Sequence, residues 1–217
     1  MRFLIVLLFL AFYSSRLFSQ NPTMLQDPLS SKRFNTEKYA AIRGTPFLVD
    51  KWLSGTAETV KGKYDGIELK FNVYDNTLLI NKDDEPYELN ENINSFTLNT
   101  GKQLLLFRKV KTSVDFNSDV YLQVLAEGNI NLFKFHIKKL AEMSEINAGI
   151  VQTFTNGAKY YIEIRGVLQS LKTDKDTIIK LQPSIEEKIN LFIKENKISF
   201  KKEDDLIRLF NFMNANN

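Results

Sequence analysis

The 217-residue chain has no cysteine and a single histidine, His136. A chain without cysteine has no disulfide framework, and structural zinc sites are built from clusters of Cys and His. A Ser-His-Asp site would depend on His136, and no G-x-S-x-G elbow is present to supply its nucleophile. The sequence therefore predicts no catalytic residue, no metal site and no cofactor, and we do not expect an enzyme.

Glycine is also scarce, at 9 residues. Neither a G-x-x-x-x-G-K-[ST] loop nor a G-x-G-x-x-G turn occurs, which disfavours phosphate-cradling and dinucleotide sites. The 26 acidic residues show no spacing that singles out a catalytic pair. A hydrolase that uses acidic residues alone stays open only because any two carboxylates can meet in a fold.

One polar turn has the spacing that opens a calcium loop. Asn81, Asp83 and Glu85 stand at every second position. The sixth position is Pro86, where such loops need glycine, and the twelfth is Asn92, where they need a bidentate glutamate. We therefore interpret this stretch as a solvated turn.

Neither sign of charge is in large excess, with 29 Lys and Arg against 26 Asp and Glu. The longest basic clusters, 108–111 and 201–202, are short and carry no interleaved aromatic residues. Nucleic-acid surfaces combine extended positive charge with stacking side chains. No nucleic-acid partner is expected.

The N-terminus has the pattern of an address segment. Arg2 precedes an apolar run at 3–13, and Leu17 and Ser19 occupy the −3 and −1 positions of a cleavage before Gln20. This run is shorter than the roughly 20 residues that span a bilayer as a helix. We predict a signal peptide at 1–19 and export to a bacterial periplasm or cell surface. No integral span is expected after its removal, although Arg16 leaves an uncleaved anchor as the alternative.

The mature chain divides into a flexible lead-in at 20–45 and one β-rich domain at 46–217. The lead-in contains Pro22 and Pro28 and few large apolar residues, and a short helical turn is expected near 38–42. Strands follow, because apolar residues alternate with polar ones at 64–74. We predict strands at 55–60, 64–74, 77–81, 86–89, 95–99, 103–110, 120–125, 131–137 and 159–164.

Short turns between these strands predict antiparallel neighbours. The apolar run at 104–107 predicts a strand that is buried on both faces, whereas 143–156 is expected to form a long loop. Phe133 and Phe135 alternate with Lys134 and His136, which predicts that His136 faces solvent.

The C-terminal region changes to a helical period. A helix is expected at 174–181, a second after a capping box formed by Ser184 and Glu187, and a third along an apolar stripe at 206–213. The acidic residues at 203–205 precede this stripe, where the helix dipole favours negative charge. The fold class is thus α+β and mainly β. We expect an antiparallel meander, open or partly closed, with two to three helices at about 174–214 packed on it.

Aromatic residues are the remaining functional hint. Trp52, the only tryptophan, is interpreted as a lid on the core, with a ligand platform as the alternative. Tyr160 and Tyr161 are adjacent, so one should face the core and the other outward. We interpret the inward aromatic residues as part of a solid core; the alternative, if the sheet curls into a barrel, is that inward Tyr and Phe line an apolar cavity.

The stretch SIEEKINLFIKENKISFKKEDDLIRLFNFM at 184–213 resembles a group of uncharacterised exported bacterial proteins. The resemblance extends over about 159–214, with a weaker similarity at 52–107. It implies a signal peptide, a strand-rich domain and two final amphipathic helices. It implies no activity and no site residue.

These observations favour a non-catalytic binding or scaffold protein of the bacterial envelope. Its partner would be an envelope protein or a small apolar ligand. The alternative is a small carrier of apolar, lipid-like ligands on a curled sheet, and a hydrolase that uses acidic residues is the third hypothesis.

Overall fold

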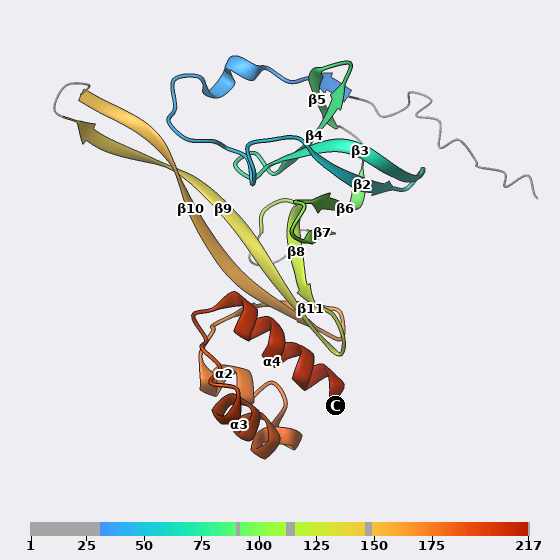
Figure 1. The fold of residues 1–217 in the computed structure, drawn as a ribbon, viewed down its shortest axis with the longest axis vertical. Helices are drawn as coiled ribbons and strands as arrows, with labels where there is room; N and C mark the ends of the chain where they lie inside the picture. The colour runs from blue at the N-terminus through green and yellow to red at the C-terminus, as the bar shows by residue number, and fades with distance from the viewer. Residues whose placement is uncertain (1–30, 90–91, 112–115, 146–148, 217) are drawn as a thin grey trace, which may run out of the picture.

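The computed structural model describes residues 31–89, 92–111, 116–145 and 149–216. The predicted signal peptide at 1–19, and the lead-in as far as residue 30, lie outside the described residues. Figure 1 shows a strand-rich upper part, a long hairpin that runs from beside it down to the other end of the molecule, and helices gathered at that end.

Eleven strands form one sheet, in the order β1-β5-β4-β3-β2-β6-β7-β8-β9-β10-β11. Their bounds are β1 Ser31–Arg33, β2 Leu53–Thr59, β3 Gly62–Asn72, β4 Thr77–Lys82, β5 Glu85–Leu89, β6 Ile93–Asn99, β7 Leu104–Val110, β8 Val120–Ala126, β9 Ile130–Glu145, β10 Gly149–Ile164 and β11 Val167–Leu171.

Neighbouring strands pair antiparallel throughout the described sheet. Two connections break the simple meander. β1 pairs with β5 instead of with β2, the strand after it, and β6 pairs with β2 instead of with β5, the strand before it. Two meanders, β2 to β5 and β6 to β11, are thereby joined in one sheet that does not close. The predicted fold class, mainly β and antiparallel with C-terminal helices, is confirmed.

The inner face of the curved sheet holds a packed aromatic core. Phe96 stacks on Phe107 at 4.7 Å between ring centroids, and Phe71 lies 5.2 Å from each. All three are buried. The alternation along β3 placed Phe71 on this face correctly. The prediction for 104–107 was wrong, because Leu104 is 64% exposed and Leu106, on the same face, is only partly buried.

The long loop predicted at 143–156 is also wrong. β9 and β10 form one hairpin that is paired without a break from Glu145↔Gly149 to Ile130↔Ile164. The alternation of apolar and polar residues is irregular here because different segments of the chain cover the hairpin at some positions and none does at others. Phe154, for example, is buried against the N-terminal segment, whereas Ile150 is 73% exposed.

A segment at residues 43–48, named the strap below, connects the far end of the hairpin to β3. The Arg43 N–H donates to Gln152 O, and the Phe154 N–H donates to Arg43 O. Beyond it, the Leu48 N–H donates to Phe71 O. Before the strap, β1 pairs with β5, and a 3-10 helix spans Thr36–Tyr39. Main-chain pairing to distant strands therefore holds the described part of the lead-in, which its composition does not reveal.

Three helices cover the lower end of β8 to β11: α2 Lys175–Ile179, α3 Glu186–Glu195 and α4 Glu203–Ala215. The apolar stripe of α4 is buried as predicted, at Leu206, Leu209, Phe210 and Met213. The capping box is wrong. Ser184 lies within a 3-10 turn, Pro183–Ile185, and no side chain caps α3 at Ile185.

Candidate functional site

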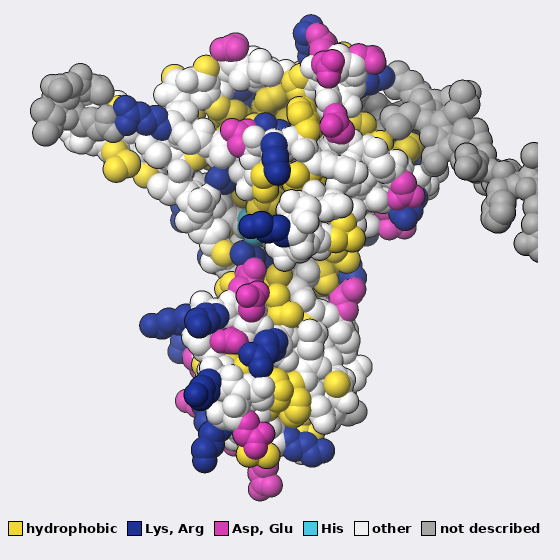
Figure 2. All heavy atoms as spheres, in the orientation of Figure 1, with side chains coloured by type: hydrophobic (Ala, Val, Ile, Leu, Met, Phe, Trp, Pro, Cys, Tyr) yellow, Lys and Arg dark blue, Asp and Glu magenta, His cyan; other side chains and the backbone are white. Residues whose placement is uncertain are grey.

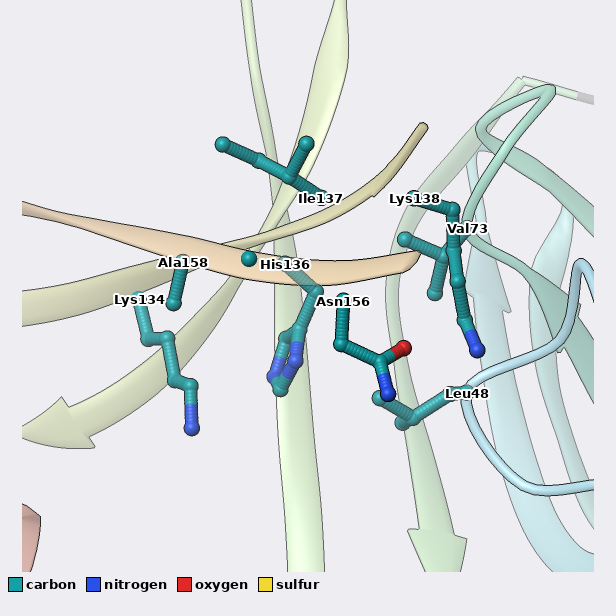
Figure 3. Close-up of a pocket in the computed structure, with 9 residues that line it drawn as sticks. Leu48, Val73, Lys134, His136, Ile137, Lys138, Asn156 and Ala158 are labelled. Atoms are coloured by element: carbon teal, nitrogen blue, oxygen red, sulfur yellow. The ribbon is translucent and has the colours of Figure 1, made fainter. Parts of the chain in front are cut away.

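A hollow of about 350 Å³ opens on the inner face, where β9 and β10 pass the strap and the end of β3. We name it the central pocket. Figure 3 shows its lining, which consists of Leu48, Val73, Lys134, His136, Ile137, Lys138, Asn156, Gly157 and Ala158. In Figure 2, a few dark-blue Lys or Arg side chains lie between the upper sheet and the helices, and more of them surround the helices at the lower end.

Strand alternation brings the polar groups of the pocket together. Lys134, His136 and Lys138 stand at every second position of β9, so their side chains share one face. Asn156 and Ala158 lie opposite Lys138 and His136 in the register of β10. Figure 3 shows Lys134, His136, Lys138 and Asn156 pointing to the same side, whereas Ile137 points to the other.

His136 lies partly buried in this hollow, not on the solvated face that its alternation predicted. Its Nε2 is 2.6 Å from Gln123 Oε1, and its ring lies 5.9 Å from that of Phe107. Burial, together with the positive charges of Lys134 and Lys138, lowers the pKa of His136 to about 4, although the charge of Glu203 opposes this shift. At neutral pH the imidazole is therefore uncharged.

Lys134 is anchored by the start of α4. Its Nζ lies 2.6 Å from Glu203 Oε2, and the Tyr160 hydroxyl donates to the same oxygen at 2.9 Å. Burial and this carboxylate raise the pKa of Tyr160 to about 12. Glu203 thus fixes a lysine at the edge of the pocket, besides its favourable place at a helix N-terminus.

Lys138 stands apart from its neighbours. Within the described residues its ammonium forms no ion pair or hydrogen bond, although the side chain is partly buried. Burial lowers the pKa of Lys138, and the charge of Asp50 opposes this effect. The Asp50 carboxylate is itself 2.6 Å from Lys70 Nζ. The pocket therefore holds a cation that has no direct counter-ion in the part of the chain that the structure describes.

Trp52 lines a second hollow, of about 340 Å³, that we name the aromatic hollow. Phe34, Phe47 and Pro86 also line it, and Lys70 Nζ lies 4.2 Å from the Phe47 ring centroid. Phe47 and Leu48 are neighbours in the strap but reach different hollows.

The other residues singled out in the sequence are held in structural contacts. Asp83 and Asp84 have positive φ in the β4–β5 turn, and Glu85 pairs with Arg33 at 2.5 Å. Tyr161 is buried against Phe116 on the opposite face from Tyr160, so the sheet is covered on both faces there. Across the described part of the chain, no group of three or more His, Asp or Glu could hold a metal ion.

No protein-family model, no curated protein and no solved structure matches this chain. Among the described residues, no helix has both the length and the apolar character needed to cross a bilayer.

The sequence pattern that marks the central pocket was recognised, but its residues were predicted to face solvent. The alternation correctly placed Lys134, His136 and Lys138 on one face. It could not show that the strap and β3, far away in sequence, would wall that face. Asn156 was missed because it fell in the predicted loop.

Proposed function

We propose that this chain is an exported, non-catalytic binding protein of a bacterial envelope, and that the central pocket is its ligand site. One observation carries the proposal: segments distant in sequence converge on a hollow that contains the Lys138 ammonium, which is unpaired among the described residues. Ligand sites are typically concave and contain a few placed polar groups.

Two features of the pocket favour binding over catalysis. The His136 imidazole is engaged by Gln123, and its lowered pKa puts it far below the range of a general base at neutral pH. Among the described residues, Asp65 and Asp174 are the acidic side chains with a shifted pKa, and hydrogen bonds from Thr56 and from the Thr177 backbone lower it. A hydrolase acid needs the opposite shift.

The alternative, a carrier of apolar ligands, is favoured by the aromatic hollow. Its lining by Phe34, Phe47 and Trp52 suits an apolar or flat guest. The main core argues against a lipid-sized cavity, because its aromatic rings are in contact.

Export is tested with a C-terminally tagged full chain expressed in a bacterium. We expect envelope fractions to contain a product whose mass corresponds to a start at Gln20. A product that retains residues 1–19 in the cytosol would contradict the export half of the proposal.

Binding is tested with two residues that occur once in the chain. His136 gives the only imidazole Cε1–H NMR resonance and reports the central pocket, whereas Trp52 fluorescence reports the aromatic hollow. We expect a small-molecule extract of bacterial envelopes to shift the His136 resonance. A change in Trp52 alone, with a co-purified lipid in native mass spectrometry, would favour the carrier. A stoichiometric protein recovered in a pull-down, with both reporters unchanged, would favour a scaffold and refute the pocket.

A further inference from the structure

Resting on the function proposed above, we propose that the central pocket binds a small organic monoanion, namely a carboxylate with a short apolar body.

Two charged side chains line the pocket, and they differ in their pairing. Lys134 is in a direct ion pair with Glu203 at 2.6 Å. Lys138 has no ion pair among the described residues; the charge of Asp50 acts on it, but the Asp50 carboxylate lies 2.6 Å from Lys70, and neither Asp50 nor Lys70 lines the pocket. A partly buried cation without a partner is unfavourable, and a bound anion would supply the missing charge.

The donors near this charge suit a carboxylate. Asn156 lies opposite Lys138 in the hairpin register, and its side-chain amide points to the same side as the Lys138 ammonium. An amide N–H and an ammonium can each donate to one carboxylate oxygen. His136 is neutral at pH 7. It therefore adds no second positive charge to the pocket, and a ligand with a single negative charge is sufficient to balance Lys138.

The wall beside these donors is apolar. Leu48 and Val73 line the pocket on the strap and β3 side, Ala158 lines it on β10, and Val73 is only 8% exposed. A hollow of about 350 Å³ lies at the small end of ligand sites. Its size suits a short acyl chain and excludes a full lipid.

The experiment follows the His136 Cε1–H resonance of the full chain during titration with three probes at pH 7. Hexanoate has a negative charge and a short acyl chain, hexanamide has the acyl chain without the charge, and inorganic phosphate has the charge without the acyl chain. We expect a saturable shift with hexanoate, with an apparent affinity roughly tenfold or more above those of the other two probes.

Variants identify the cation. Lys138→Gln should weaken hexanoate binding roughly tenfold, and Lys138→Arg should retain most of it. Lys139→Gln is the matched control, because the neighbouring Lys139 is exposed and its side chain lies on the opposite face of β9. Thermal unfolding of each variant shows whether it is folded.

The outcomes separate this inference from the proposed function. If hexanamide binds as well as hexanoate, or if Lys138→Gln leaves hexanoate affinity unchanged in a folded protein, the monoanion is refuted while the pocket remains a binding site. If no probe and no envelope extract moves the His136 resonance, both proposals fail.

Discussion

The same face of β9 meets two environments along its length. At its lower end, Ile130 and Leu132 are buried beneath α4. Further along, the face carries Lys134, His136 and Lys138 and opens into the central pocket. The helices provide a complete cover, whereas the strap provides a partial one. One amphipathic strand can therefore contribute to a sealed core at one end and to a polar hollow at the other.

The largest loss of stability should come from a cavity at the end of β9 that the helices cover. Phe210 is 0% exposed within the helix cluster, so Phe210→Ala should lower the free energy of unfolding by about 4 kcal/mol, because a large cavity replaces the ring. Urea unfolding measures this loss. Leu191→Ala on α3 is the control, since Leu191 is 56% exposed and should change stability by less than about 0.5 kcal/mol. Equal losses would show that the helices do not seal this end.

The hollow end should be sensitive to pH. The pKa of His136 is about 4 in the folded chain and about 6.5 when unfolded. Between these values the unfolded state binds the proton more readily, so stability falls as the pH is lowered from 6.5 to 4. The contribution of His136 is about 3 kcal/mol.

Subtracting the stability profile of His136→Gln isolates this contribution, because the carboxylates titrate in both proteins. We expect the wild type to lose about 3 kcal/mol more than the variant between pH 7.5 and pH 4. Parallel profiles would place the imidazole in water.

A smaller effect should come from the polar latch beside the sealed end. Asn214 Oδ1 accepts the Ile130 N–H at 2.9 Å, and its amide donates to Ile130 O and Glu127 O. Asn214→Ala leaves these backbone groups without partners and should cost about 2 kcal/mol in chemical unfolding. Asn216→Ala is the comparison, because Asn216 donates only within its own helix, to Phe212 O. If both variants cost the same, α4 is not latched to the β8–β9 turn.

The smallest effect should come from the segment that precedes the strap. The Tyr39 hydroxyl donates to Asp75 and accepts from Asn72 Nδ2. Tyr39→Phe keeps the ring contacts with Tyr74 and Phe154 and removes these bonds, which should cost about 1 kcal/mol in thermal unfolding. Tyr39→Ala should cost clearly more; a smaller cost than for Tyr39→Phe would mean that the aromatic contacts do not hold the segment.

The spacing of apolar residues along the chain predicted individual strands and helices and their buried faces. The alternation around Phe71 placed a strand and its buried face, and the stripe around Phe210 placed a helix. Both residues belong to apolar faces that any compact fold would bury, so the period of the apolar residues was sufficient to predict their burial.

Contacts with segments that are distant in sequence could not be predicted from this spacing. The strap hydrogen-bonds to Gln152 and Phe154, more than 100 positions away, through main-chain groups that carry no sequence signal. The polar face of β9 was consequently assigned to solvent, and the irregular part of β10 to a loop. The candidate site lies where these two errors meet, and for that reason its residues were recognised singly but not as a site.

The most direct test is an NMR titration of the His136 imidazole, the only one in the chain. If the polar face of β9 is enclosed by the strap and β3, the Cε1–H shift should stay nearly constant from pH 8 to pH 5.5 and move only near pH 4. A midpoint near 6.5 would contradict the account, because it would show that His136 is an ordinary solvated side chain.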